Sequence, residues 1–273
     1  MKRFSKETEL EIVNLYDRGY TQKEIADKLG TFNTSIGRVL LRYNIFLKGN
    51  DKQQRLCKHN PFKNNDEYSE YYLGLLLTDG NIDYKSKRNR IRLSLNETDG
   101  YLVEEFLNWS APEARVTKTL QKINNSYMWS AAITNTEALE WLERKANFYN
   151  KSFDAKLYIP ITYHILRGII DGDGGFYPQN TSAVKISICG KSLIFLKQIQ
   201  FFLNKEGYHS SLFEHNNLYY IQIVRVEDVL RLGANLYENA HIFCKRKYEK
   251  WLAFYESRRA NTLNSGKEMA IQP

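Results

Sequence analysis

Two aspartates, Asp79 and Asp173, each end an apolar stretch, and each is followed directly by a glycine. The stretches read "YYLGLLLTDGNI" and "ILRGIIDGDGGFY", and the aspartates occupy matching positions 173 − 79 = 94 residues apart. A carboxylate at a helix C-terminus is unfavourable by roughly 0.3 to 1 kcal/mol, and two facing carboxylates also repel each other. A divalent cation compensates both effects, since Mg²⁺ prefers oxygen ligands. We therefore predict a metal site at Asp79 and Asp173, with the backbone carbonyls of Gly80 and Gly174 beside them.

Both apolar stretches are predicted to be helices that contact each other. The leucines around Gly74 leave no polar face, so the first helix should be buried on all sides. Gly74 in the first helix and Gly168 in the second would allow the backbones to approach closely and bring the two aspartates together. The alternative is that each Asp-Gly pair forms an ordinary turn. Asp171 has Leu77 at its matching position, so we expect it to make a local capping or turn hydrogen bond rather than to bind metal.

The segments that follow the two aspartates have the same order. "IRLSL" begins 91 − 79 = 12 residues after Asp79, and "VKISI" begins 184 − 173 = 11 residues after Asp173. In each half, strand patterns alternate with amphipathic helix patterns. An internal duplication explains this order and predicts an α+β fold of two pseudo-twofold-related αββαββα repeats. The predicted boundaries are 67–159 for the first repeat, 160–258 for the second, and 259–273 for a disordered tail.

The motifs "YLGLLLTDG" (72–80) and "LRGIIDGDG" (166–174) resemble those of the LAGLIDADG homing endonucleases, over about residues 66–258. The resemblance implies that the two repeats form a saddle-shaped DNA-binding sheet. It implies a Mg²⁺-dependent double-strand break across the minor groove of one long DNA target, with Mn²⁺ able to substitute. Asp79 and Asp173 would be the catalytic residues that hold the metal.

Basic residues near the strand ends would assist the reaction in such a family member. Lys191 follows "ISICG" in the second half, whereas Thr98 stands at about the matching place in the first. Lys151 in "NKS" and Lys247 in "KRKYEK" resemble basic positions that follow the last strands. We predict Lys191 and Lys151 as catalytic residues; a solvated surface lysine is the alternative for any one of them.

Specificity should come from one face of the predicted strands. Side chains alternate along a strand, so Ile91, Leu93 and Leu95 should face helices while their neighbours face DNA. Arginine can then read guanine and glutamine can read adenine in the major groove. The predicted contacts are Arg90, Arg92, Ser94, Lys185, Ser187, Tyr220 and Gln222. An ordinary solvated sheet face is the alternative.

Residues 1–46 contain three short helical patterns and resemble a helix-turn-helix DNA-binding module. Thr21 can cap the second helix, and the third is expected over about Thr34 to Tyr43, with Tyr43 turned inward. Thr34, Ser35, Arg38 and Arg42 would form the open face that enters the major groove. The alternative is any small three-helix bundle. Residues 47–66 read as a basic linker.

Composition agrees with a nucleic-acid partner without proving one. The formal net charge is +8 and the pI is about 9.2, which favours polyanions because lysine and arginine displace counterions from phosphate. The apolar runs are too short for a membrane helix, and the start "MKRFSKETELEIV" lacks a secretory signal. Cys57, Cys189 and Cys244 are widely spaced and read as ordinary reduced thiols.

We therefore expect a monomer without membrane contact, in a bacterial or phage-type cytoplasm or in an organelle, and not secreted. Double-stranded DNA is the expected partner, and intron RNA is a second one. The leading hypothesis is a freestanding or intron-encoded endonuclease that acts in intron homing. The alternatives are a maturase, which assists RNA splicing, and a non-catalytic DNA-binding regulator, which would not need both aspartates.

Overall fold

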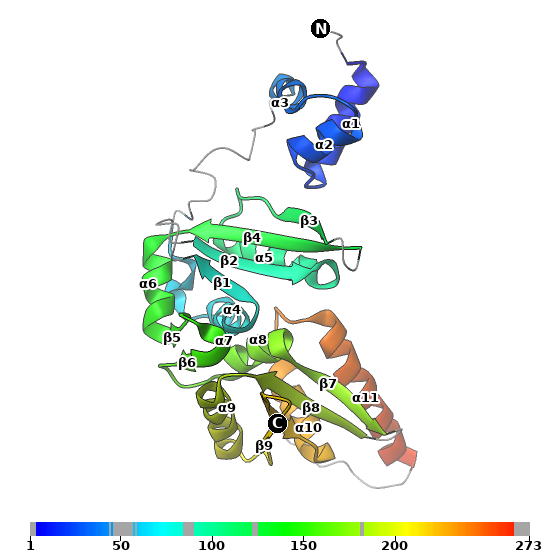
Figure 1. Ribbon diagram of the computed structural model, residues 1–273. Helices are drawn as coiled ribbons and strands as arrows, with labels where there is room; N and C mark the ends of the chain where they lie inside the picture. Colours follow the sequence, from blue (N-terminus) through cyan, green and yellow to red (C-terminus); the bar gives the residue numbers. More distant parts are fainter. Residues whose placement is uncertain are drawn as a thin grey trace. The chain divides into compact units, whose positions relative to one another are not determined.

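The computed structural model describes residues 4–43, 45, 57, 59–83, 90–121, 125–180 and 183–264 (Figure 1). Its contacts divide the chain into two compact units. Unit 1 consists of Met1–His59 with Arg92–Asn135, and unit 2 consists of Asn60–Ile91 with Thr136–Pro273. The boundary passes through one strand of the first repeat, β2 (Arg90–Asn96). The predicted linker, 47–66, lies mostly outside the described residues.

The N-terminal part of unit 1 is a three-helix bundle: α1 (Lys6–Asp17), α2 (Gln22–Lys28) and α3 (Asn33–Arg42). The predicted cap is confirmed, because the Thr21 side chain accepts a hydrogen bond from the Glu24 backbone and the Glu24 carboxylate accepts one in return. The core consists of Ile12, Leu15, Tyr16, Ile25, Ala26, Ile36, Val39 and Leu40. Tyr43 was predicted to face inward, which is wrong: it follows the last turn of α3 and is 37% exposed.

The first repeat begins with a 3-10 turn, η2 (Pro61–Asn64), and with α4 (Glu67–Thr78), in which Tyr71 through Leu77 are buried as predicted. Its four-stranded sheet has the order β1-β2-β4-β3. The remaining elements are β1 (Gly80–Asp83), η3 (Glu97–Asp99), α5 (Gly100–Ser110), β3 (Thr117–Gln121), β4 (Ser126–Thr134), α6 (Thr136–Lys145), β5 (Ala146–Asn147), α7 (Lys151–Asp154) and β6 (Lys156–Leu157).

The second repeat has the same plan, with a sheet of order β7-β8-β10-β9. Its elements are α8 (Tyr163–Asp173), β7 (Gly174–Asn180), β8 (Ala183–Gly190), α9 (Leu193–Lys205), β9 (Ser211–His215), β10 (Leu218–Ile223) and α10 (Val226–Tyr237). The last helix, α11 (Lys245–Asn264), continues past the predicted repeat boundary at residue 258. Two αββαββα repeats in one α+β fold confirm the predicted fold class.

The fully buried apolar side chains of β8 and β10 point to one face of the second sheet. Ile186 and Ile188 on β8, and Ile221 and Ile223 on β10, are buried, whereas their neighbours in sequence are not. Helices α9 and α10 pack against this side of the sheet. We call the other side of the second sheet its open face.

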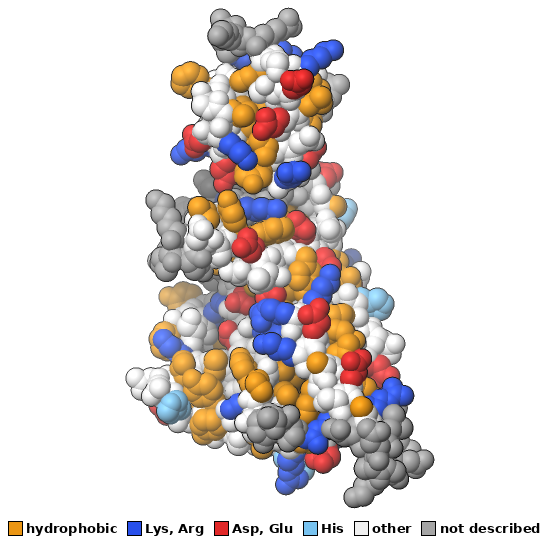
Figure 2. Space-filling view, turned by 90° about the vertical axis from the view of Figure 1, so that its right-hand side faces the viewer, with side chains coloured by type: hydrophobic (Ala, Val, Ile, Leu, Met, Phe, Trp, Pro, Cys, Tyr) orange, Lys and Arg blue, Asp and Glu red, His pale blue; other side chains and the backbone are white. Residues whose placement is uncertain are grey.

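Charged side chains of both signs share the surface in Figure 2, where Lys and Arg stand among acidic and hydrophobic groups. On this face the positive charge is therefore not gathered into one continuous patch. None of the helices in the described part of the chain is both long and apolar enough to cross a membrane.

Candidate active site

The two motif helices, α4 and α8, contact each other through their glycines. A Cβ added to Gly74 would lie 2.2 Å from the backbone oxygen of Ile165, and one added to Gly168 would lie 2.1 Å from the backbone oxygen of Tyr71. The contacts are reciprocal, because 168 − 74 = 94 and 165 − 71 = 94. Both glycines are therefore required at this crossing, as the sequence predicts, and the helix pair has a local pseudo-twofold axis.

The C-terminal ends of these helices lie side by side. The Asp79 carboxylate oxygen Oδ2 is 3.0 Å from the position that a Cβ on Gly172 would take. The glycine after each aspartate also lacks room for a side chain: a Cβ on Gly80 would lie 2.6 Å from Leu76, and one on Gly174 would lie 2.9 Å from Ile170. The Asp-Gly sequences thus allow the chain to fold back over the last helical turn, and they leave both aspartates exposed to solvent.

Two lysines bind the carbonyl groups at these helix ends. Lys151 Nζ donates hydrogen bonds to the backbone oxygens of Leu77, at 3.0 Å, and of Thr78. Lys247 Nζ donates to the backbone oxygens of Ile170, Asp171 and Gly172 at 2.8, 2.6 and 3.2 Å. An ammonium group is favourable here because a helix C-terminus carries partial negative charge. Each motif helix is therefore capped by one lysine.

Lys247 occupies in the second repeat the role that Lys151 has in the first. The acceptors Asp171 and Gly172 match Leu77 and Thr78, and the two lysines are 247 − 151 = 96 residues apart, close to the repeat distance of 94. Lys247 was named from sequence only as a resembling basic position and was not among the predicted catalytic residues. The near-repeat spacing was the signal that could have paired it with Lys151.

The carboxylates and the lysines shift one another's pKa values. Asp173 reaches solvent, but the protein packed around it partly desolvates its carboxylate and raises its pKa, and the nearby Lys151 and Lys247 ammonium groups oppose that rise. Burial lowers the pKa of Lys151, against the opposing charges of Asp173 and Asp79. It also lowers the pKa of Lys247, against Asp171 and others. The site thus interleaves anionic and cationic groups in partly desolvated surroundings, where their interactions are stronger than in water.

A cavity of about 320 Å³ opens beside Asp173, and Lys151, Cys189 and Lys191 are among its lining residues. Lys191 is exposed, and its ammonium lies 5.1 Å from the ring centroid of Phe153. The structure therefore brings both predicted catalytic lysines to the Asp173 side of the site. Lys151 donates to backbone carbonyl groups, whereas Lys191 is exposed beside the Phe153 ring. Burial raises the pKa of the Cys189 thiol.

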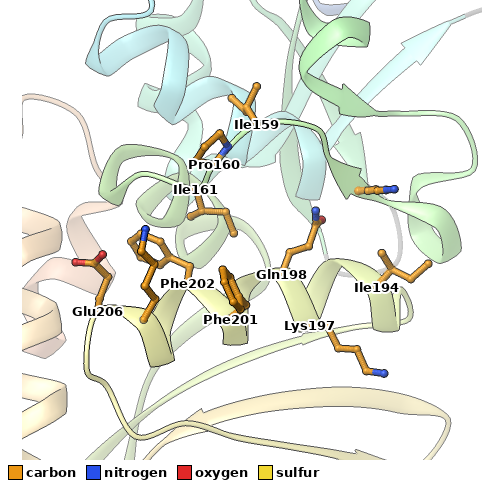
Figure 3. A pocket seen from close by; sticks show the side chains of 11 residues that line it. Ile159, Pro160, Ile161, Ile194, Lys197, Gln198, Phe201, Phe202 and Glu206 are labelled. Atoms are coloured by element: carbon orange, nitrogen blue, oxygen red, sulfur yellow. The ribbon is translucent and has the colours of Figure 1, made fainter.

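A second cavity, of about 520 Å³, contains none of the predicted site residues. Ile159, Pro160 and Ile161 lie opposite Phe201 and Phe202 of α9 there (Figure 3). Its lining is mainly apolar, and it offers no pair of carboxylates for a metal. We therefore place the candidate chemistry at the helix ends instead.

Asp171 does not make the local hydrogen bond predicted for it. Its Oδ2 accepts hydrogen bonds from the Cys244 backbone N–H at 2.6 Å and from the Tyr71 hydroxyl at 3.0 Å. Both partners are far away in sequence, so a local pattern could not reveal them. Burial raises the pKa of Asp171 to about 6, with these hydrogen bonds and the charges of Lys247 and Arg167 opposing the rise. Asp171 points into the protein and is separate from the exposed carboxylates.

A buried arginine of α8, Arg167, holds this helix against neighbouring segments. Its guanidinium donates to the backbone oxygens of Ile242 at 2.8 Å and Leu236 at 2.7 Å, and it forms an ion pair with Glu67. These bonds join α8 to α4 and to the segment before α11. Burial lowers the pKa of Arg167, and the Glu67 carboxylate opposes that effect.

The predicted DNA contacts fall on two kinds of surface. Thr34 and Arg38 are exposed on α3 and Ser35 is half-buried, while Arg42 forms an ion pair with Glu9 of α1. In the strands, Arg92 is exposed, and Arg90, Ser94, Lys185, Ser187, Tyr220 and Gln222 are half-buried. Ser187 and Gln222 are partners in the β8–β10 register, which places them on the open face. Contact of these residues with DNA stays a prediction.

The donors at the helix ends suit a hard divalent cation but do not complete its coordination. Asp79 and Asp173 supply carboxylate oxygens, while no cluster of three or more His, Cys, Asp or Glu side chains is placed to hold a metal within the described ranges. Mg²⁺ is commonly held in this way, by one or two carboxylates together with water and substrate phosphates. The residues therefore fit a metal that is bound jointly by protein and nucleic acid.

Comparison with solved structures identifies the fold as that of the LAGLIDADG homing endonucleases. The homing endonuclease I-WcaI bound to its DNA recognition sequence matches with a TM-score of 0.52 and 16% identity, over 77% of this chain and 96% of that one. The I-LtrWI LAGLIDADG homing endonuclease bound to target DNA matches with a TM-score of 0.50 and 12% identity, over 72% and 92%. Residues 163–237, which run from α8 to α10 in the second repeat, match the family model of the LAGLIDADG-like domain. No curated protein matches the sequence.

The lysine caps lead to a stability prediction. Replacing Lys247 with methionine should lower the free energy of unfolding by about 2 to 3 kcal/mol, because buried carbonyl groups lose a charged donor. Urea denaturation measures the change. Lys250→Met is the matched control, because Lys250 is exposed on the same helix; it should change stability by less than about 0.5 kcal/mol. Equal losses in both variants would contradict the capping role.

Proposed function

We propose that the protein is a site-specific DNA endonuclease that hydrolyses one phosphodiester on each strand with the help of Mg²⁺. The observation that carries this proposal is the pair of exposed carboxylates, Asp79 and Asp173, at the adjoining C-terminal ends of two glycine-packed helices. A purely structural role leaves unexplained why two carboxylates lie exposed where the helix dipoles disfavour them.

In this proposal the chain's own residues have separate tasks. Asp79 and Asp173 hold the metal together with the backbone at Gly80 and Gly174. A metal held there would supply activation of water and stabilisation of charge on the leaving oxygen. Lys151 and Lys247 fix the helix ends and offset the charge of the carboxylates, while Lys191 has room to reach a phosphate at the cavity.

The sheets would bind the DNA. The fold relatives I-WcaI and I-LtrWI are bound to DNA targets, and this chain has two four-stranded sheets that could serve the same purpose. Arg92, Ser187 and Gln222 lie on strands and would make groove contacts, and exposed Arg38 and Thr34 on α3 would extend the recognised site.

Cleavage of a randomised duplex library, in Mg²⁺, Mn²⁺ or EDTA, tests the proposal. We expect one sequence family to be cut in both strands with either metal, and we expect no cutting in EDTA. Cleavage that persists at the same rate in EDTA would refute the metal requirement. Selection of a duplex sequence without cutting in any condition would refute the endonuclease and favour a DNA-binding regulator. Splicing of a candidate host intron with and without the protein tests the maturase alternative.

A further inference from the structure

The open face of the second sheet carries four rings, which we call the aromatic platform: Tyr177, Phe213, His215 and Tyr220. Phe213 and Tyr220 are partners in the β9–β10 register, and their rings stack with centroids 5.6 Å apart at an interplanar angle of 15°. The His215 ring centroid lies 6.4 Å from that of Tyr220. The three rings on β9 and β10 thus form one contiguous group.

Tyr177 extends this face across β7. It pairs with Lys185, and its ring lies over Gly175, where an added Cβ would be 3.2 Å from the ring. Tyr177 remains 45% exposed and Phe213 41% exposed. The platform side chains therefore lie on the side of the second sheet that faces away from its buried isoleucines.

Exposed rings of this kind are not needed to complete the core, because the buried side of the sheet already packs on α9 and α10. Contiguous exposed apolar surface with polar neighbours is typical of a binding surface. Here the neighbours are Lys185, Ser187 and Gln222, which can contact phosphates or base edges. The platform therefore adds an apolar component to a face that is otherwise polar.

The first sheet differs at the equivalent positions. The side chains of β2, β3 and β4 that point away from the buried Ile91, Leu93, Ala131 and Ile133 are Arg90, Arg92, Ser94, Asn96, Thr117, Thr119, Gln121, Ser126, Met128, Ser130, Ala132 and Thr134. None of these described positions carries a ring. Ser94 and Ser130 share a hydrogen bond of 2.8 Å, and Asn96 donates to Ser126 at 3.2 Å.

The aromatic side chains of β4 point the other way. Trp129 packs on Gly100, where an added Cβ would lie 2.4 Å from its ring, and Lys118 covers it at 3.6 Å from the ring centroid. The two sheets thus offer different chemistry: hydrogen-bonding groups on the first, and rings with a few polar groups on the second.

One apolar group distinguishes base pairs in the major groove, the 5-methyl group of thymine. We propose that the second sheet recognises its half of the DNA target by packing thymine methyl groups on Phe213, Tyr220 and Tyr177. The first sheet reads its half through hydrogen bonds. This inference rests on duplex DNA being the ligand, as in the proposed function, but it does not require cleavage.

Replacing thymine with deoxyuridine tests the inference, because it removes the methyl group and keeps the base pairing. Affinity for the selected duplex is measured in EDTA, with substitutions confined to one half of the target at a time. In the half that the second sheet binds, we expect the affinity to fall about three- to fivefold for each methyl group that it contacts. This factor corresponds to the burial of one carbon, about 0.8 kcal/mol. Substitution in the other half should change affinity less than twofold.

Variants assign the effect to the platform. Phe213→Ser and Tyr220→Ser should bind more weakly and lose most of the sensitivity to deoxyuridine, whereas Phe213→Leu should keep it because leucine remains apolar. Thr119→Ala, on the exposed first-sheet face, should retain the full sensitivity. Because these side chains are partly or largely exposed, circular dichroism should show unchanged folding.

Several results would overturn the inference. Unchanged affinity with deoxyuridine in both halves would contradict it, as would a deoxyuridine effect that survives in Phe213→Ser and Tyr220→Ser. Tighter binding of single strands than of any duplex, lost in the same variants, would instead assign the platform to stacking on unpaired bases. Methyl-dependent binding without cleavage would support this inference and refute the endonuclease. Cleavage without methyl dependence would support the endonuclease and refute this inference. Failure to select any duplex would refute both.

Discussion

Replacing Asp79 or Asp173 with asparagine should lower the rate of DNA cleavage by at least 10²- to 10³-fold. Asparagine keeps the size of the side chain and removes the charge that would hold a cation, and losing one electrostatic contact in a preorganised site costs about this much. The measurement is single-turnover cleavage of the selected target in saturating Mg²⁺, with plasmid substrate to resolve nicked from linear product. Either no cutting or nicking of one strand is the expected product pattern.

Binding must be separated from cleavage in this test. In EDTA, each variant should bind the target as tightly as the wild type or more tightly, because one carboxylate no longer repels the phosphates. Glu214→Gln is a matched control: it removes an exposed acid on β9 and should cleave at the wild-type rate. If Asp79→Asn and Asp173→Asn cut at the wild-type rate, the carboxylates are not the metal ligands.

The repeat architecture could be predicted from sequence because its signals are local and occur twice. Apolar stretches with Asp-Gly ends, alternation in "IRLSL" and the 94-residue spacing predict α4, α8 and the central strands. The outer strands β1, β3, β7 and β9 were implied by the repeat plan but were not placed individually. Two of them, β3 ("TKTLQ") and β9 ("SLFEH"), are largely exposed and lack a buried alternating pattern. The β1 strand does alternate, but it has only four residues.

The site was predicted less completely, because its remaining contacts join distant segments. Asp171 finds its partners at Tyr71 and Cys244, and Lys247 reaches back to the end of α8. The ion pair of Arg167 with Glu67 likewise joins residues that are 167 − 67 = 100 positions apart, and no local pattern reveals it. Motif spacing predicts the pair of carboxylates, and near-repeat spacing could have paired Lys247 with Lys151. Only tertiary packing shows which carbonyl groups these lysines bind.

Replacing Gly74 or Gly168 with alanine should have the largest effect on stability. Alanine favours a helix over glycine by about 1 kcal/mol, yet its Cβ would lie within 2.2 Å of a backbone oxygen of the facing helix. A backbone oxygen cannot rotate away as a side chain can, so the helices must separate. We expect each variant to lose about 3 kcal/mol of unfolding free energy, measured by urea denaturation. Gly190→Ala is the control, since nothing lies within 4 Å of its added Cβ; it should be nearly neutral.

The same variants test whether the helix crossing positions the carboxylates. A displacement of about 1 Å at a reacting centre can cost about 10²-fold in rate, so variants that still fold should cleave at least that much more slowly. The double variant is the sharper measurement. Because the two glycines make reciprocal contacts, separating the helices for one alanine also makes room for the other. The double variant should therefore lose clearly less stability than the sum of the single losses. If the stability losses of the single variants add up in the double variant, the two glycine contacts are relieved independently. The two helices would then not move apart as one unit.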